Sequence, residues 1–154
     1  MNQIFNILCR GLVGHYSYMA TTSSNTVYSE YLLYEPMLRI FQAKGYIVHC
    51  EFTIDNSGKG DNKRIDFRIK KGSIEFAIEV KWARSKTINV NNDIEKLIMY
   101  NNKYNSNGYI LVFGYFKHLQ NLKFSNNKKF ISSGKIVHWD SGKTNYACRW
   151  FKIV

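Results

Sequence analysis

The sequence has few cysteines, and their spacing matches no common pairing or metal-binding pattern. Cys9, Cys50 and Cys148 are the three cysteines of the 154 residues, an odd number with no CxxC spacing. They therefore indicate neither a disulfide framework nor a zinc knuckle. We expect a protein of the reducing cytoplasm, where free thiols persist.

Several other signatures are missing as well. The four histidines are isolated and show no HxH or HExxH spacing, which argues against a zinc site. The glycine-containing segment 57–60 lacks the GxxxxGK[ST] pattern of a phosphate-binding loop. No apolar stretch approaches the roughly 20 residues of a membrane-spanning helix, so we expect no membrane partner. The chain contains no internal repeat and no low-complexity tract.

Acidic residues are scarce relative to basic ones. The chain has 22 Lys and Arg against 11 Asp and Glu, a net charge of +11. A basic surface of this extent implies an anionic partner, of which nucleic acid is the commonest. The alternative is a basic protein without such a partner. Residues 117–154 carry one acid, Asp140, against eight basic residues: Lys117, Lys123, Lys128, Lys129, Lys135, Lys143, Arg149 and Lys152.

Helical periodicity is clearest in the N-terminal third of the chain. An apolar stripe predicts a helix over 27–44, in which Pro36 kinks the helix or marks a second start at Glu35. Gly45 is placed to end this helix. Residues 1–20 fit either a short helix or an irregular arm packed on the domain.

A second helix and several strands follow. Asn92, with Glu95 three residues later, predicts the N-cap of a helix over 90–104. The run 109–116 is apolar throughout, as expected of a central buried strand. The remaining segments are strands expected over 46–54, 64–70, 73–83, 135–139 and 145–154, a polar loop over 55–62 and a hairpin turn over 140–143.

These elements predict the fold class. A chain of 154 residues with 45% hydrophobic residues is expected to form one domain with a true core. The order helix, three strands, helix, strand favours an α/β fold, with helices packed on the faces of a mixed sheet. We place the core at about 26–116, an N-terminal arm at 1–25 and a basic, β-rich extension at 117–154.

The most informative feature is a group of charged residues on two neighbouring strands. Side chains of a strand alternate between faces, so Glu79 and Lys81 share one face of 73–83. A turn at 71–72 would bring Asp66, on the strand before, beside them. Two carboxylates and a lysine suit a hard divalent cation and a phosphate. The alternative is a cross-strand salt bridge on an exposed sheet face, which contributes only ~0–1 kcal/mol.

Glu30 adds a third carboxylate. It lies within the apolar stripe of the first long helix, one turn before Tyr34. A carboxylate there is costly unless it meets a metal, a base or hydrogen bonds. We expect Glu30 to lean toward Asp66 and Glu79. The alternative is an acid that only complements the positive end of the helix.

The arrangement resembles the PD-(D/E)XK nuclease superfamily, whose fold is the restriction-endonuclease-like αβββαβ core. The matching residues are Glu30, Asp66 and Glu79-Val80-Lys81, and the order of elements agrees over about 27–116. The sequence departs from the pattern at Ile65, where a proline is expected. Some branches also place Gln four residues before Tyr in the second helix, where this chain has Lys96.

The resemblance implies metal-dependent hydrolysis of phosphodiester bonds, most naturally by an endonuclease on DNA. Asp66, Glu79 and the Val80 carbonyl would hold Mg²⁺, for which Mn²⁺ can substitute. The ion would polarise the phosphoryl oxygen and activate a water. Lys81 would position that water or stabilise the developing charge. Glu30 would bind a second ion, directly or through water.

Further basic residues are candidates for contacts with nucleic acid. Such contacts are mostly to the phosphate backbone and do not depend on base sequence. For Lys96 the alternative is an ordinary solvated lysine. A homodimer is compatible with the resemblance. The rival functions are an inactive nucleic-acid-binding module of the same fold and a protein-interaction factor for immunity or assembly. The candidate contact residues are Lys59, Arg84, Lys86, Lys96, Lys128 and Lys129.

Overall fold

A mixed sheet forms the centre of the protein. The computed structural model describes residues 1–22, 29–54, 62–125, 130–140, 142 and 144–153. Seven strands pair in the order β1-β2-β3-β5-β9-β7, with β8 also paired to β9. Only β3 and β5 run parallel, and the other pairs of this sheet are antiparallel. The strands are β1 (Ile47–Thr53), β2 (Arg64–Lys71), β3 (Ile74–Ala83), β5 (Asn107–Tyr115), β7 (Phe130–Ser133), β8 (Val137–Asp140) and β9 (Asn145–Ile153).

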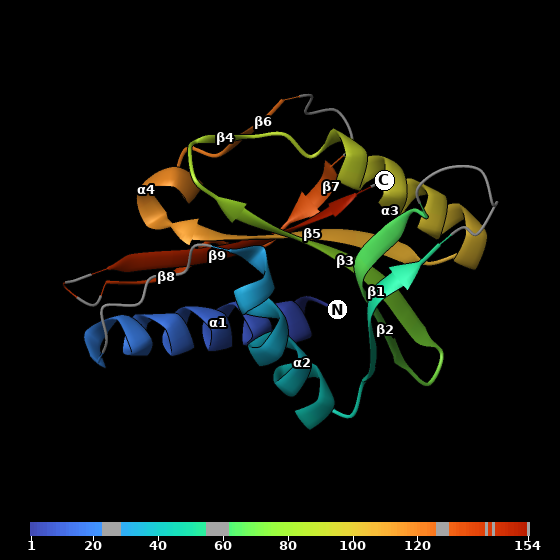
Figure 1. Cartoon of the computed structure of the whole chain (residues 1–154), viewed down its shortest axis with the longest axis horizontal. Helices are drawn as coiled ribbons and strands as arrows, with labels where there is room; N and C mark the ends of the chain where they lie inside the picture. The colour runs from blue at the N-terminus through green and yellow to red at the C-terminus, as the bar shows by residue number, and fades with distance from the viewer. Residues whose placement is uncertain (23–28, 55–61, 126–129, 141, 143, 154) are drawn as a thin grey trace.

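Helices cover both faces of this sheet, as expected for the α/β class. In Figure 1, α1 and α2 lie below the sheet and α3 lies above it. A separate two-stranded ribbon, β4 paired with β6, arches over the α3 side. The bounds of these elements are α1 (Asn2–Thr22), the 3-10 helix η1 (Glu30–Leu33), α2 (Tyr34–Ala43), β4 (Thr87–Ile88), α3 (Asn91–Tyr104), α4 (Phe116–Leu119) and β6 (Lys123–Phe124).

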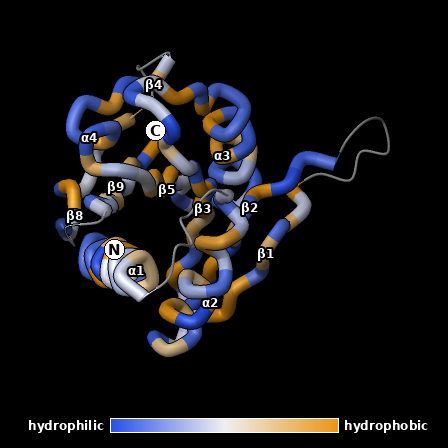
Figure 2. Tube along the Cα trace, turned by 60° about the vertical axis from the view of Figure 1, so that its left-hand side comes forward, coloured by the Kyte–Doolittle hydropathy of each residue, from blue (hydrophilic) through white to orange (hydrophobic). Residues whose placement is uncertain are grey.

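Alternation along the strands divides the core into two layers. Ile78 and Val80 of β3 pack with α1 and α2, whereas Ala77 packs with α3. The strand β5 is buried on both faces over 108–114, as expected of a central strand. Figure 2 shows hydrophobic residues gathered along β3 and β5, between α1 and α3. The site residues Glu79 and Lys81 therefore face the α3 layer.

The N-terminal segment is a long helix and part of the core, not an arm. The helix α1 has 21 residues, and its apolar side is buried. The Phe5 ring lies 4.5 Å from the Tyr109 ring and 5.3 Å from the Trp150 ring, centroid to centroid. Aromatic rings at these separations stabilise a core beyond the area that they bury.

The helix expected over 27–44 is divided in two within the described residues. A short 3-10 turn, η1, precedes α2, which starts at Tyr34, one residue before the expected second start. Pro36 lies in the first turn of α2, where no amide donor is needed. Gly45 follows the helix with a φ of 75°, which confirms its expected role. Residues 27 and 28 are outside the described part.

Two other expectations need correction. The helix α3 begins at Asn91, and the Asn89 side chain accepts a hydrogen bond from the Asn91 amide at 3.0 Å, so Asn92 is not the N-cap. The C-terminal segment also does not form a separate extension. Its last strand, β9, lies between β5 and the β7 and β8 strands inside the sheet, and β8–β9 is the expected hairpin.

None of the helices in the described residues combines the length and the apolar character that crossing a membrane requires.

Candidate functional site

The antiparallel register of β2 and β3 brings Asp66 and Glu79 together. Phe67 and Ile78 are the last paired residues of the two strands at this end, and Asp66 and Glu79 are the residues that follow them, close enough for the charge of Asp66 to act on Glu79. Asp66 Oδ2 accepts a hydrogen bond from the Val80 amide at 2.7 Å. The expected pairing of these two carboxylates is therefore present, and local strand geometry produces it.

The face of β3 that carries Glu79 is covered by α3 and is not an exposed sheet face. Glu79 is 1% exposed, and its carboxylate faces the first turns of α3. The sequence pattern correctly placed Glu79 and Lys81 on one face of β3. It did not indicate that a helix covers that face. The alternative of a salt bridge on an exposed sheet is excluded for the same reason.

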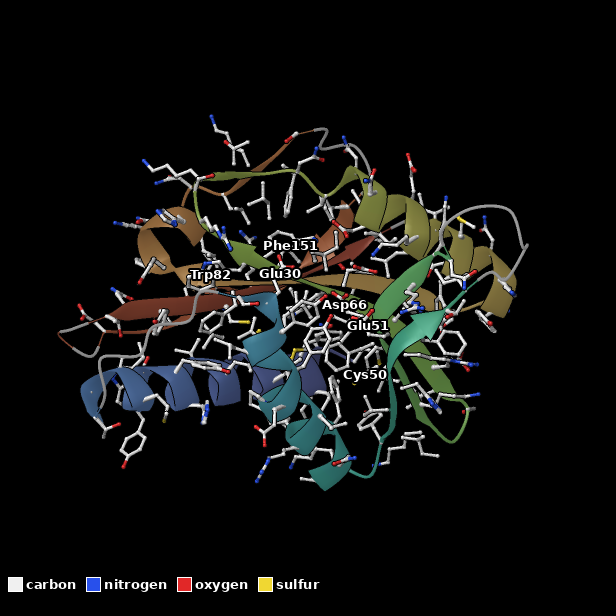
Figure 3. The ribbon with its side chains drawn as sticks, in the orientation of Figure 1. Glu30, Cys50, Glu51, Asp66, Trp82 and Phe151 are labelled. Atoms are coloured by element: carbon white, nitrogen blue, oxygen red, sulfur yellow. The ribbon has the colours of Figure 1, made fainter. Side chains whose placement is uncertain are left out.

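Glu30 reaches the same end of β3 from η1. Its Oε1 accepts a hydrogen bond from the Trp82 amide at 3.1 Å, and its Oε2 lies 4.0 Å from Lys81 Nζ. The Ser29 hydroxyl, which accepts a hydrogen bond from the Tyr31 amide, caps the turn that carries Glu30. Figure 3 shows Glu30 close to Trp82, with Asp66 on the adjoining strand. Glu30 therefore has a specific partner beyond the helix dipole.

Asp93 is a member of the site that the sequence analysis did not assign. It lies in the first turn of α3 and is only 7% exposed. Its carboxylate lies 3.2 Å from Lys81 Nζ and 3.5 Å from Lys96 Nζ. An acid in the first turn of a helix is common for reasons of the helix dipole alone. The only signal in the sequence was its position three residues before Lys96.

Lys96 is not a solvated surface lysine. Its ammonium group lies 2.7 Å from Glu79 Oε1, and the side chain is 22% exposed. The site therefore contains four carboxylates and two ammonium groups. They come from η1, β2, β3 and α3: Glu30, Asp66, Glu79, Asp93, Lys81 and Lys96.

Burial and mutual repulsion disturb the ionisation of these carboxylates. Burial, and then the charge of Asp66, raise the pKa of Glu79 to about 9, although Lys96 opposes the shift. Burial also raises the pKa of Asp66, against hydrogen bonds from Val80 and Tyr34. Perturbed carboxyl groups of this kind gather at functional sites more often than elsewhere.

For Lys81 and Lys96, burial has a smaller effect on the pKa than the neighbouring charges together have. Burial opposes their charged forms, but the neighbouring carboxylates outweigh that effect and raise both pKa values. The acids responsible are chiefly Asp93 for Lys81 and Glu79 for Lys96. Both ammonium groups are therefore charged at neutral pH.

Glu51 adds a strained residue beside Asp66. Cys50 pairs with Phe67 and Phe52 pairs with Ile65, so Glu51 lies level with Asp66 but is not paired with it. Its φ of 50° is unusual for a residue other than glycine. The Glu51 carboxylate accepts a hydrogen bond from the Tyr34 hydroxyl at 3.2 Å. Figure 3 shows Glu51 and Asp66 on adjacent strands.

The donor set fits a hydrated divalent cation better than a fully ligated one. Among the described residues, no three Asp, Glu, His or Cys side chains are gathered as a complete ligand set. Asp66 and Glu79 nevertheless lie side by side, and four carboxylates face only two ammonium groups. Mg²⁺ is usually held by one or two carboxylates and completes its shell with water and phosphate oxygens.

The structure describes only two of the remaining candidate residues for contacts with nucleic acid. Arg84 and Lys86 are exposed just beyond the end of β3, close in sequence to the site. Lys59, Lys128 and Lys129 lie outside the described residues. The Val80 side chain is fully buried on the opposite face of β3, which leaves only its backbone to serve the site.

Comparison of the chain with protein-family models, with curated proteins and with solved structures gives no match. The interpretation of the site therefore depends on its residues and their geometry.

Proposed function

We propose that the protein is a metal-dependent nuclease of the PD-(D/E)XK type, most naturally an endonuclease acting on DNA. The observation that supports this best is the convergence of Asp66, Glu79 and Lys81 at one end of two paired strands. Glu30 adds a fourth group from a preceding helical turn. These are the residue types, the order and the strand positions that the resemblance requires.

The arrangement of elements supports a restriction-endonuclease-like core. Apart from the two-residue strand β4, which pairs outside the main sheet, the segment from η1 and α2 through β1, β2 and β3 to α3 and β5 follows the order helix, three strands, helix, strand. The strands β3 and β5 are parallel neighbours joined through α3. This crossover places the first turn of α3 over the end of β3, where the charged residues gather.

The residues that match the resemblance each have a role in this proposal. Asp66 and Glu79, with the Val80 carbonyl, would hold Mg²⁺ or Mn²⁺, which polarises the phosphoryl oxygen and lowers the pKa of a bound water. Lys81 positions the attacking water or stabilises the charge that develops on the phosphate. Glu30 orients Lys81, from 4.0 Å, and would support a second ion.

The charge of the whole molecule supports a polynucleotide substrate. A net charge of +11 favours binding to a phosphate backbone regardless of base sequence. Arg84 and Lys86 continue the positive charge of Lys81 away from the site along the same segment. The free cysteines Cys9, Cys50 and Cys148 fit a cytoplasmic location, in which thiols stay reduced.

A second candidate is a nucleic-acid-binding module of the same fold without catalysis. Two observations favour it. The buried carboxylates are already paired with lysines, since Glu79 contacts Lys96 and Asp93 contacts Lys81. The described residues also contain no complete set of three metal ligands. A protein-interaction factor is the third possibility considered.

Cleavage assays separate these functions. Plasmid, linear and single-stranded DNA and RNA are incubated with the protein in Mg²⁺, Mn²⁺ or EDTA. We expect cleavage of DNA that requires metal and that falls at least about 100-fold in Asp66→Asn and Lys81→Met. Glu35→Gln is the matched control, because Glu35 is an exposed acid of α2 that pairs with Arg39 at the surface.

Each outcome points to one function. Binding without cleavage in every metal favours the inactive module, and absence of any binding at low salt favours the interaction factor. Circular dichroism of each variant establishes that lost cleavage does not reflect unfolding.

A further inference from the structure

A positive charge already lies where the carboxylates of the site meet. Lys96 Nζ is 2.7 Å from Glu79 Oε1 and 3.5 Å from Asp93 Oδ1, and it also acts electrostatically on Asp66. These three acids come from β2, β3 and α3. The ammonium group therefore contacts carboxylates from two separate elements, β3 and α3, and is also within the electrostatic influence of Asp66 on β2.

Lys96 is the counter-ion available to a carboxyl group that water cannot reach. Glu79 is 1% exposed, so its carboxylate form needs a counter-charge within the protein. Removing one partner of a buried ion pair is strongly destabilising, because it leaves a buried charge uncompensated. Lys96 is the only lysine or arginine among the described residues whose ammonium or guanidinium group lies within 4.0 Å of Glu79.

A divalent ion and the Lys96 ammonium group cannot share this position. Two cations a few ångströms apart in a poorly hydrated site repel each other strongly. Lysine has a flexible four-carbon stem, so its ammonium group can move without a change in the helix. Asp93 is already 3.5 Å away and can retain it.

We propose that Lys96 is a built-in counter-ion that a divalent cation displaces from Glu79, with Asp93 retaining the displaced ammonium group. This inference rests on the proposed metal site and adds to it a competition within the protein. Its consequence is that wild-type protein binds the ion more weakly than its carboxylates alone would. When no metal is bound, Lys96 also compensates the carboxylate form of Glu79.

Calorimetric titration of the full chain with Mn²⁺ tests the competition. Lys96→Met removes the ammonium group and keeps most of the side-chain volume. We expect its Kd for Mn²⁺ to be at least about tenfold lower than that of the wild type, within the usual range for two coupled sites. Lys123→Met, an exposed lysine of β6, is the matched control and should bind as the wild type does.

Thermal unfolding gives a second readout. In EDTA at a pH of about 9 or above, Lys96→Met should unfold at a lower temperature than wild type, because the carboxylate form of Glu79 has lost its counter-charge. Saturating Mn²⁺ should then raise the unfolding temperature of the variant by more than it raises that of wild type.

A measurement on the wild-type protein tests the displacement even if the Lys96→Met variant does not fold. The side-chain ¹⁵N signal of Lys96 is followed by NMR during a titration with Mg²⁺. We expect this signal to shift as the ion binds, while that of Lys123 stays in place.

The outcomes separate this inference from the proposed function. Equal Mn²⁺ affinities, with a Lys96 signal that Mg²⁺ does not move, would overturn the displacement and leave a metal-dependent nuclease intact. Binding by Lys96→Met but not by wild type would support the displacement and favour the inactive module. Absence of binding by both proteins would overturn both.

Discussion

At the scale of single residues, the site places four acidic side chains beside only two lysines, and the most buried acid is Glu79. Glu79 lies beside Asp66 and has one close counter-ion, Lys96. Asp93 contacts both lysines and so determines where their ammonium groups lie. The site is thus a network of shared ion pairs. Lys81 is shared by Glu30 and Asp93, and Lys96 is shared by Glu79 and Asp93. Such networks respond as a unit when one member changes.

The raised pKa of Glu79 predicts how stability depends on pH in the absence of metal. Its folded-state pKa of about 9 lies above the ordinary value of 4.5. The native state therefore binds more protons than the unfolded state over this range, and stability falls as pH rises from about 5 to 9. Asp66 contributes in the same direction.

Urea unfolding in EDTA at several pH values between 5 and 9 measures this effect. We expect the unfolding midpoint of the wild type to decrease across the range, and that of Glu79→Gln to decrease less, because glutamine does not titrate. Parallel curves for the two proteins would show that Glu79 ionises normally in the folded state.

At the scale of elements, close backbone approaches lock the C-terminal strands together. Gly134, between β7 and β8, lies against the Trp150 indole so closely that an added Cβ would be 2.1 Å from Trp150 Nε1. Its amide donates to the Trp150 carbonyl at 3.0 Å, and its carbonyl accepts from Arg149 at 2.9 Å. Glycine at this position is therefore a packing requirement of the fold.

Two glycine-to-alanine substitutions, one at this contact and one in α1, should change the free energy of unfolding in opposite directions. Gly134→Ala forces the backbone away from Trp150 and should lower the free energy of unfolding by about 1–3 kcal/mol. Gly14→Ala, in the interior of α1 with open space around it, should raise it by about 0.5–1 kcal/mol. Chemical denaturation measures both. A loss of stability in Gly14→Ala would show that α1 is not helical there.

At the scale of the whole molecule, the excess of positive charge and the continuous sheet are the main features. The strands β5 and β9 are neighbours in the sheet although residues from near the end of the chain form β9. The strand β9 therefore completes the sheet that carries Asp66 and Glu79, and its basic residues Arg149 and Lys152 belong to that same sheet.

The charge of the molecule predicts that nucleic-acid binding depends steeply on salt. Phosphate contacts release counter-ions, so the logarithm of the affinity should fall linearly with the logarithm of salt concentration. Lys86→Gln should weaken DNA binding at every sequence and reduce this slope by about 1. Fluorescence anisotropy with labelled duplexes of unrelated sequence measures both. An affinity that does not change between low and moderate salt would instead favour a protein partner.

Local sequence patterns predicted much of the site because they act over short distances. Alternation with a period of two and a tight turn at 71–72 suffice to place Asp66 beside Glu79, with Lys81 on the same face of β3. The apolar run of β5 likewise predicted a central strand. The periodicity of 90–104 predicted a helix but not its first residue, since the Asn89 side chain, rather than Asn92, serves its N-terminus.

The sequence by itself determined the α/β class, six of the strands and the pair of carboxylates, because side-chain alternation and turns depend on neighbouring residues; it did not indicate β4, β6 or β7. Only the tertiary structure decided that α1 is part of the core, that α3 covers the acids, and that Lys96 and Asp93 meet them. Those features depend on how helices dock on a sheet. The docking of a helix depends on apolar surfaces that are far apart in the chain. A local sequence pattern does not predict which of these surfaces will pack together.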